Sequence, residues 1–388
     1  MTHVYITGIG ATAVGEHYTR SLADLVLDAF GQALANLPSA LDPQRIGALY
    51  IANAHGAMLA GQANMGAAVA DIVGLNGIEA LTVEAAGASG GMAVRQAALA
   101  IRSGAADLVA VVGIEKVTDK LDPTQEASVA LALDSDFEAE HGLTRTAQWA
   151  LLMRRYMHEY GYAAEAFAPF PVNAHANAAS NKGAMYRFPI SADKYRTAGQ
   201  VASPLNMLDC ASLADGAAVL LLASEAMAQE LGGVPIRIAG SAVATDTLAL
   251  YDRPDPLWLA AVERSATAAM QQAGVAHRTI NVLEVTDPHG VAAALALEAS
   301  GFVGRGAALR HAADGGITLA GSTPLATAGG YKARGDIGGA SGVYQVLEIA
   351  RQLRGVSGVA PVEGARVGFA QSVGGVGTTA VTHILVRE

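Results

Sequence analysis

Two short runs of small residues have the composition of a site that binds a developing negative charge. Gly87-Ala88-Ser89-Gly90 opens a predicted helix over Met92–Ser103, and Gly339-Ala340-Ser341-Gly342 opens a second over Tyr344–Leu353. A helix N-terminus presents backbone N–H groups and a dipole that favour negative charge. Two such helix starts aimed at a shared point would bind a carbonyl oxygen or another oxyanion. The similar context of the two runs also predicts an internal duplication.

Other chemical motifs are incomplete or missing from the sequence. Gly8 and Gly10 follow an apolar run, but Ala13 replaces the third glycine of a dinucleotide fingerprint, which favours a tight turn. The sequence has no phosphate-binding loop, no paired-histidine zinc motif and no nucleophile elbow around Ser89 or Ser341, which are expected to cap helices. A single cysteine excludes an internal disulfide or a cysteine-rich metal module. We expect no metal and no cofactor.

The composition excludes several classes of protein. The 388 residues are 52% hydrophobic, and only 15% are charged; the usual charged share is about 25%. This balance excludes a disordered chain, and the net charge of −10 argues against a nucleic-acid partner. Little charge for this length predicts a large core and a buried subunit interface. Without a signal-peptide pattern or a long apolar run, the chain is expected to be cytoplasmic, with no membrane contact.

Elements that could position the two helix starts alternate along the chain. Short β-branched runs between alanine-rich helical segments indicate an α/β fold with a buried sheet. Strands are predicted at Val4–Thr7, Ala48–Ala52, Asp107–Val112, Ala217–Ala223, Ile236–Ala239, Val282–Val285, Val367–Ala370 and Ala380–Val386, and further helices at Ser21–Ala35, Trp149–Tyr160, Ala174–Asn181 and Pro256–Ala273. We divide the chain into halves at 1–233 and 234–388, with an inserted region over about 119–200.

Ordered segments along almost the whole chain resemble the thiolase superfamily, in particular the branch of archaeal thiolases and the thiolase domain of sterol carrier protein X. The segments are VEAAGASGGMAVRQAALAIRSGAADLVAVVGIEKVTD (83–119), RRYMHEYG (154–161), DCASLADGAA (209–218), TDTLALYDR (245–253), EVTD (284–287), GGYKARGDIGGASG (329–342) and QSVGGVGTTAVTHIL (371–385). The resemblance implies a five-layered α/β/α/β/α fold of two pseudo-symmetric halves with mixed sheets, an acyl-CoA substrate, and a homodimer or tetramer.

The family's catalytic side chains are replaced in this sequence. Gly87 stands where the family has its nucleophilic cysteine, so an acyl-cysteine intermediate cannot form there. Thr286-Asp287 replaces the histidine–aspartate pair that helps to bind the thioester oxygen, and Asp336 replaces the histidine that activates the nucleophile. Ser372 occupies the place of the second cysteine, and Cys210 matches a cysteine away from the nucleophile.

The resemblance leaves a set of candidate site residues. Backbone N–H groups of Gly87 and Gly374 would form the oxyanion site. Asp336, His289, His55 and Asp287 are candidate catalytic groups, and Thr286, Tyr331, Tyr344 and Ser372 are candidates for lining the pocket. For each side chain, packing in the core or in a turn is the alternative.

Two functions follow from these residues, and a third is weaker. The first is an enzyme that acts on acyl-CoA carbon–carbon bonds without an acyl-cysteine, by aldolase-like cleavage or acyl transfer; the superfamily's steroid side-chain aldolases also lack the cysteine. Those aldolases carry tyrosines where this chain has Thr286 and Asp336. The second is a non-catalytic subunit that assembles with an OB-fold, zinc-ribbon partner. The third is ordinary acetyl-CoA acetyltransferase activity.

Overall fold

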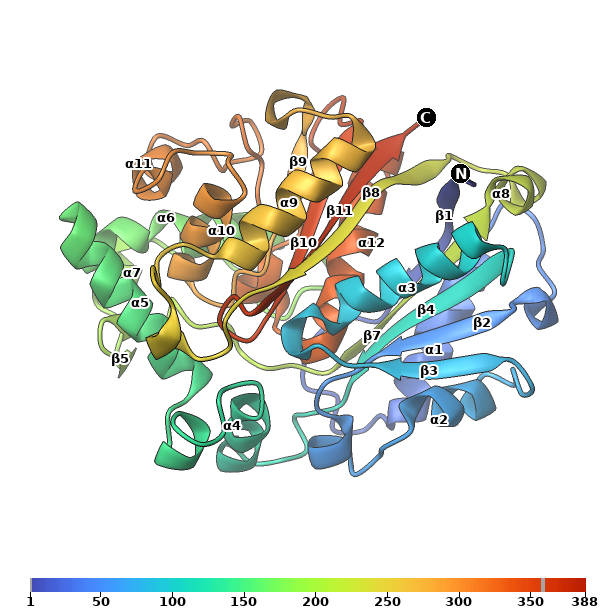
Figure 1. Ribbon diagram of the computed structural model, residues 1–388, viewed down its shortest axis with the longest axis horizontal. Helices are drawn as coiled ribbons and strands as arrows, with labels where there is room; N and C mark the ends of the chain where they lie inside the picture. Colours follow the sequence, from blue (N-terminus) through green and yellow to red (C-terminus); the bar gives the residue numbers. More distant parts are fainter. Residues whose placement is uncertain (1, 357–359) are drawn as a thin grey trace.

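Nine strands form one mixed sheet in the computed structural model, which describes residues 2–356 and 360–388 (Figure 1). The order across the sheet is β3-β2-β4-β7-β1-β8-β11-β10-β9, and β5 and β6 form a separate pair. The strands are β1 Val4–Ala11, β2 Ala48–Ala52, β3 Glu79–Val83, β4 Leu108–Glu115, β5 Gln200–Ala202, β6 Leu205–Asn206, β7 Gly216–Ser224, β8 Ile236–Thr245, β9 Val282–Glu284, β10 Val367–Gly374 and β11 Thr379–Arg387. The helices are α1 Leu22–Ala35, α2 Met65–Ile72, α3 Ser89–Ser103, α4 Asp122–Ala130, α5 Arg145–Tyr160, α6 Pro169–Ala178, α7 Ala192–Arg196, α8 Glu225–Leu231, α9 Ala260–Ala273, α10 Gly290–Ala299, α11 Ala308–Ala313 and α12 Ser341–Arg354.

The sheet consists of two topologically equivalent halves. The order β2-β4-β7-β1 in the first half corresponds to β9-β10-β11-β8 in the second. In both, the first pair is parallel and the next two pairs are antiparallel. A parallel bridge between Leu283 and Leu325 takes the place beside β9 that β3 occupies beside β2. The halves meet where β1 pairs with β8 at Tyr5↔Arg237 and Ile6↔Ile236. The expected duplication is therefore visible in the strand pairing.

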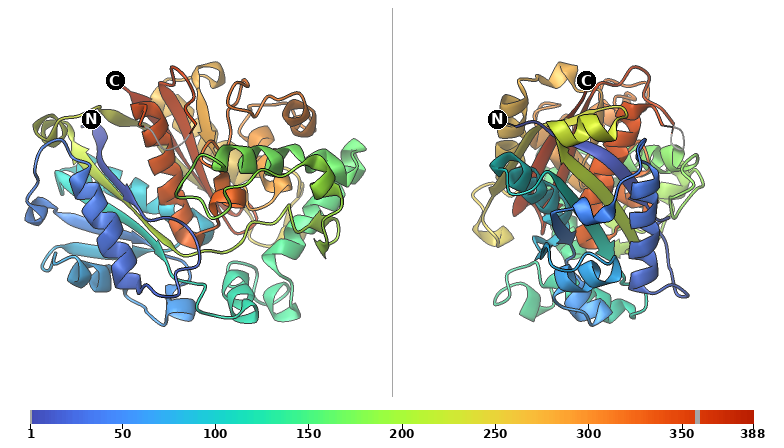
Figure 2. Two further views of the ribbon diagram at one scale, coloured as in Figure 1. Left: turned by 180° about the vertical axis from the view of Figure 1, so that it is seen from behind. Right: turned by 90° about the vertical axis from the view of Figure 1, so that its right-hand side faces the viewer.

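Three large apolar clusters fill the spaces between the layers. Helix α1 and β-strands of the first half bury one cluster, and α9 and α10 bury another against β8, β10 and β11. The third cluster lies between the two halves of the sheet and is filled by α3 and α12 (Figure 2). The expected α/β/α/β/α arrangement is confirmed, with the strands of both halves joined into one continuous sheet.

The two runs of small residues meet where α3 and α12 cross. A methyl group built on Gly90 would lie 2.6 Å from the Cα atom of Gly342, so the backbones touch. Ser89 Oγ accepts the N–H of Ala85, and Ser341 Oγ accepts the N–H of Ile337, both over 2.9 Å. Each serine thus bonds back to the residue four positions earlier. Helix capping was the wrong expectation for both, because these hydroxyls hold the preceding loop and not the first turn of the helix.

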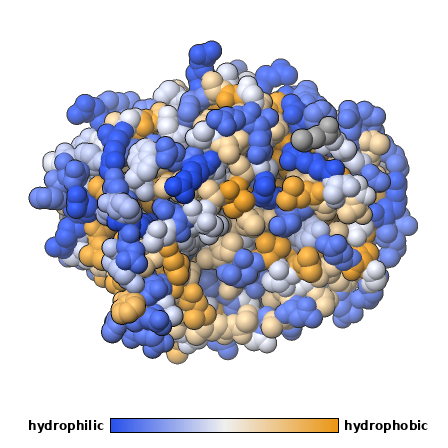
Figure 3. Space-filling view, in the orientation of Figure 1, coloured by the Kyte–Doolittle hydropathy of each residue, from blue (hydrophilic) through white to orange (hydrophobic). Residues whose placement is uncertain are grey.

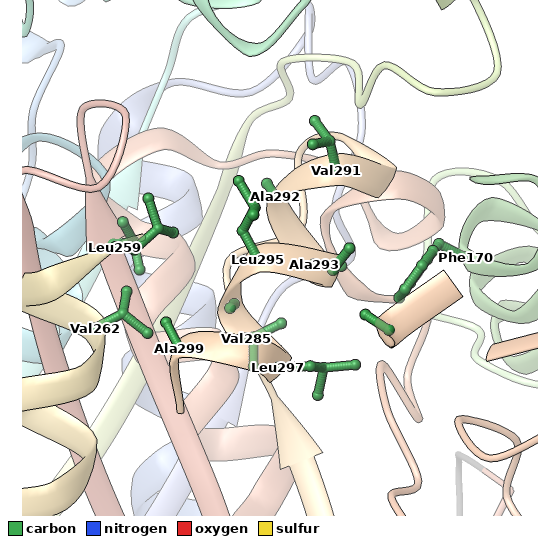
Figure 4. Close-up of a cluster of buried hydrophobic side chains, with 14 of the residues drawn as sticks. Phe170, Leu259, Val262, Val285, Val291, Ala292, Ala293, Leu295, Leu297 and Ala299 are labelled. Atoms are coloured by element: carbon green, nitrogen blue, oxygen red, sulfur yellow. The ribbon is translucent and has the colours of Figure 1, made fainter. Parts of the chain in front are cut away.

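The inserted region lies between β4 and β7 and carries α4 to α7, whereas β10 turns directly into β11. Helix α10 packs against α5 and α6 of this region, and all ten of its residues are buried (Figure 4). Its apolar side chains point to every side, toward α9 and toward Phe170 of α6. This helix was missed in the sequence because a helix buried all round has no polar face. None of the helices in the described residues has the length and apolarity needed to span a membrane.

The crossing of α3 and α12 predicts opposite effects for two glycine-to-alanine changes. Gly90→Ala should lower the free energy of unfolding by at least about 2 kcal/mol, because the added methyl would overlap the backbone of α12. Gly31→Ala, in α1, should raise it by about 0.5–1 kcal/mol, because no atom lies within 4 Å of its new methyl. Urea unfolding of both variants checks this. Equal effects of the two changes would contradict the described packing.

Candidate active site

The loop before α3 lies in direct backbone contact with the end of β10. A Cβ atom built on Gly87 would lie 2.6 Å from the carbonyl oxygen of Val373, and one built on Gly374 would lie 2.3 Å from that of Ala85. Both distances are too short for a side chain unless the backbone moves. Ala86 adopts a positive φ of 51° to make this approach, which is unfavourable for a residue with a Cβ atom. The predicted oxyanion residues are therefore brought together, with no room for a side chain.

Thr286 holds the end of β10 in this contact through hydrogen bonds. Its Oγ1 accepts the N–H of Val373 over 2.8 Å and lies 3.3 Å from the hydroxyl of Tyr331. Burial and the nearby charge of Asp336 raise the pKa of Tyr331, which therefore stays a neutral phenol. Thr286 and Tyr331 lie beside the Gly87–Gly374 contact and help to fix it.

A second group of polar side chains surrounds the start of α12. Asp336 is buried; its Oδ2 accepts from the guanidinium of Arg145 over 2.9 Å, and its Oδ1 accepts the N–H of Gly338 over 3.0 Å. Nearby, Glu115 accepts N–H groups of His55 and Gly339 and so ties the loop after β2 to the start of α12. Burial raises the pKa of Glu115 to about 8, against the pull of these donors.

The histidine of this group is held neutral. His55 is buried, and its Nδ1 lies 3.0 Å from the hydroxyl of Ser128 on α4. Burial, with the charge of Arg145, lowers the pKa of His55 to about 4, although Asp336 opposes the shift. A neutral imidazole near a carboxylate can accept a proton or relay one. Because the charge of Asp336 acts on His55, these two candidate residues lie near each other.

Asp287 stabilises the loop that carries Tyr331. Its Oδ1 accepts the N–H of Tyr331 over 2.8 Å. Burial raises the pKa of Asp287 to about 7, while Tyr331 N–H and the charge of Arg334 lower it. Arg334 is itself buried, pairs with Glu348 over 2.6 Å and lies over the rings of Tyr331 and Tyr344. This buried network positions the loop and does not reach the cavity.

A polar cavity of about 620 Å³ opens beside Arg145, the partner of Asp336. Arg145 and His289 line it, together with residues of α4 and the segment 211–213. Of the side chains proposed from the sequence, only His289 lines this cavity, and Asp336 borders it through Arg145.

Two candidates for pocket lining lie in the core instead. The hydroxyl of Tyr344 donates to the carbonyl oxygen of Ala217, and Ser372 Oγ donates to Gln345. Neither residue lines the cavity in the described part of the chain. Both side chains hold the central layer.

Arg145 and Glu115 are the site residues that the sequence did not reveal. Arg145 begins α5, where Thr144 Oγ1 caps the helix by accepting the N–H of Ala147. The capping threonine could have marked this helix start, but the partner of Arg145 is 191 residues away. Glu115 ends an otherwise apolar strand, and an acid in that position is a signal of a buried polar role.

Both halves of the chain match models of a known protein family. Residues 3–226 match the family model for the thiolase N-terminal domain, and residues 242–387 match the one described as thiolase C-terminal domain-like. An acetyl-CoA acetyltransferase of Methanothermobacter thermautotrophicus is 36% identical over 100% of both chains. A 17-hydroxy-3-oxo-4-pregnene-20-carboxyl-CoA lyase of Mycobacterium tuberculosis is 30% identical over 92% of this chain and 93% of the lyase. The solved Ltp2-ChsH2(DUF35) aldolase superposes with a TM-score of 0.86 at 25% identity, covering 99% of this chain and 98% of that chain.

The raised pKa of Asp287 predicts a pH dependence of stability. The folded protein holds a proton on Asp287 up to about pH 7, whereas an ordinary aspartate releases it near 3.8. The contribution of this group is therefore complete below its ordinary pKa and is lost as the pH rises through 7. Asp287→Asn keeps the oxygen that accepts from Tyr331 but cannot ionise. Between about pH 5 and pH 7, wild type should lose up to about 1.4 kcal/mol per pH unit relative to the variant.

Urea unfolding at several pH values measures this difference. The exposed Asp136→Asn change is the control and should follow wild type at every pH. Parallel stability profiles for wild type and Asp287→Asn would show that Asp287 does not carry the proton.

Proposed function

Because the chain belongs to the thiolase family, as the matches to both of its halves show, we propose that it binds an acyl-CoA thioester and breaks a carbon–carbon bond of the acyl group without an acyl-enzyme. The lyase and the aldolase among its relatives support cleavage of this kind. The cofactor-free chemistry and the acyl-CoA substrate are both parts of the proposal.

The Gly87 contact carries the proposal. A covalent route needs a nucleophile at position 87, in the loop before α3, and Gly87 has neither a side chain nor the space for one. The same contact brings the loop before α3 and the end of β10 together, and we propose that their backbone N–H groups bind one oxygen. Such donors stabilise an oxygen that becomes negative during the reaction, whether or not a covalent intermediate forms. Loss of the nucleophile with retention of the loops therefore favours chemistry through an enolate.

An aldol-type cleavage meets these requirements. A base takes the proton from the hydroxyl on C3 of the acyl group, and the C2–C3 bond breaks as the C3 oxygen becomes a carbonyl. The bonding electrons move onto the thioester as an enolate, whose oxygen the N–H groups of Gly87 and Gly374 would hold. The base then returns its proton to C2, which completes the reaction. No acyl group is transferred to the protein, and no oxidant is consumed.

Asp336 is the proposed proton acceptor. Its carboxylate lies just before α12, and Arg145 and Gly338 N–H fix its orientation. A base held in position by two donors needs little reorganisation when the substrate binds. His289 is the alternative proton acceptor, since it lines the cavity with a neutral ring.

A non-catalytic subunit is the second candidate function. The replaced side chains favour it. So does the wall of the cavity, where Glu16, Asp122 and Glu126 outnumber Lys120 and Arg145 and would repel the phosphates of CoA. In this case an OB-fold, zinc-ribbon partner would supply the missing charge. The name of the solved Ltp2-ChsH2(DUF35) aldolase joins two proteins, which indicates that this relative pairs with another chain.

A cytoplasmic homodimer or tetramer is part of either proposal. Strand β3 lies at one edge of the sheet. Leu81 on this strand is 50% exposed, and Leu99 on α3 is 40% exposed. Figure 3 shows apolar residues toward the centre and lower part of the face that these elements share, between more hydrophilic sides. An outer strand with exposed apolar side chains is typical of a surface that pairs with another chain. We propose that a second copy covers it.

Exchange of C2 hydrogens tests the enolate. An enzyme that stabilises a thioester enolate should exchange the C2 hydrogens of propionyl-CoA with solvent deuterium, which mass spectrometry detects. Asp336→Asn should exchange about 100-fold more slowly or not at all, because the general base is lost. Asp193→Asn, on the exposed end of α7, is the control and should exchange like wild type.

The outcomes separate the two candidate functions. Wild-type exchange that Asp336→Asn loses supports the lyase with Asp336 as the base. Full exchange by Asp336→Asn removes Asp336 from that role. Absence of exchange in wild type, with or without a copurified partner, would favour the non-catalytic subunit.

The backbone contact also predicts that a thiol cannot be restored at position 87. Gly87→Cys should show no thiolysis of acetoacetyl-CoA and should unfold with about 1–3 kcal/mol less free energy, because its Cβ would meet Val373 O. Gly304→Cys, with no atom within 4 Å of the new Cβ, should match wild-type stability. Thiolysis and urea unfolding measure the two effects. A stable Gly87→Cys protein with thiolase turnover would contradict the described contact.

A further inference from the structure

A second cavity, of about 740 Å³, lies where β8 runs between α3 and α9 (Figure 1). Arg95 and Arg102 of α3 line it, together with Arg237 at the start of β8. No aspartate or glutamate among the described residues lines it, and it shares no lining residue with the cavity beside Arg145. Because the whole chain has a net charge of −10, this local excess of positive charge needs an explanation.

The two arginines of α3 have no carboxylate partner in the described part of the chain. Arg95 donates through Nη1 to the carbonyl oxygen of Ser241, and Arg102 donates through Nη2 to that of Ile238 over 3.2 Å. These bonds hold both guanidinium groups against β8 without neutralising them. Arg237, in contrast, is paired with Glu388. Two uncompensated positive charges therefore remain at the cavity.

The two guanidinium groups also repel each other. Burial and the charge of Arg95 lower the pKa of Arg102, although an arginine stays charged at neutral pH. An anion bound between the two groups would replace this repulsion with attraction. The fork of a guanidinium matches the oxygen atoms of a phosphate group, which is why arginine is favoured where phosphates are recognised.

The spacing of the arginines determines the size of the anion. Arg95 and Arg102 are seven residues apart on α3, which corresponds to about 10 Å along the helix axis. A single phosphate group is short for that span, whereas a diphosphate reaches further and carries more charge. The volume of about 740 Å³ suits a small molecule, and Leu99 and Ile238 add apolar surface beside the arginines.

We propose that this cavity is a binding site for a diphosphate group, either free pyrophosphate or the diphosphate of a nucleotide, with Arg95 and Arg102 as its ligands. The site is separate from the cavity beside Arg145 and does not depend on the proposed cleavage reaction. Leu99 also belongs to the surface assigned above to a second copy, so the site borders that interface.

Calorimetric titration of the full chain with pyrophosphate, ADP, adenosine and citrate tests the proposal. Pyrophosphate or ADP should bind at least about tenfold more tightly than adenosine or citrate. Gln272→Glu keeps the Oε1 atom that accepts the N–H of Ser241 over 2.9 Å but adds a negative charge to the cavity wall. It should weaken diphosphate binding at least about tenfold. Gln271→Glu adds the same charge at an exposed position outside the cavity and should bind as wild type.

Loss of a ligand gives a second readout. Arg102→Gln should weaken diphosphate binding about tenfold, because one charged donor is removed. Arg264→Gln removes a charge from an exposed position on α9 and should have no effect. Urea unfolding of each variant establishes that it is folded.

The results separate the possible ligands. Tighter binding of ADP than of pyrophosphate identifies a nucleotide, and equal binding identifies the free anion; both support the site. Absence of diphosphate binding overturns the inference, and so does equal weakening by Gln271→Glu and Gln272→Glu. Preference for citrate, or equal binding of adenosine and ADP, overturns the diphosphate as ligand.

Deuterium exchange of propionyl-CoA keeps this inference distinct from the proposed function. Exchange by Gln272→Glu should match wild type, because the two cavities are separate. Its loss in a folded Gln272→Glu protein would make this cavity part of the acyl-CoA site and overturn the separate site. Diphosphate binding by a protein that shows no exchange would support the site and contradict only the proposed cleavage.

Discussion

The contact between the loop before α3 and the end of β10 is the constraint on which the site depends. It forces glycine at positions 87 and 374, because each would place a Cβ atom against a carbonyl oxygen of the other segment. The contact requires α3 and α12 to pack in the central layer with their small residues together. The duplicated sheet supplies this layer from both sides. Backbone geometry thus persists in a place where the family's side-chain chemistry has gone.

The charged groups around this contact have different tasks. Glu115 and Asp287 accept backbone N–H groups of the loops and hold them, and both have pKa values raised by burial. Asp336 also accepts a backbone N–H, yet its pair with Arg145 brings it to the edge of a cavity. His289 lines the same cavity, and its ring lies near the backbone of Asp209 without a well-formed hydrogen bond. Positioning groups and groups available to a ligand are therefore separable by their hydrogen bonds.

Sequence patterns predicted the buried, apolar strands of the main sheet, whereas β3, whose side chains are exposed or half-buried, was missed. They also predicted that the two Gly-Ala-Ser-Gly runs belong together, and the structure confirms that they meet at Gly90 and Gly342. Local patterns could not find α10, which has no polar face. Nor could they find Arg145, since its importance comes from a pairing across 191 residues. Tyr344 and Ser372 appeared near the site in the sequence, but packing turns both side chains into the core.

The central claim is that a thioester is activated here without an acyl-enzyme. One incubation with propionyl-CoA in deuterium oxide tests it most directly, if mass spectrometry follows both the thioester and the intact protein. The account predicts deuterium at C2 of the thioester and a protein of unchanged covalent mass, because Gly87 offers no atom for acylation. A protein that gains the mass of a propionyl group would contradict it.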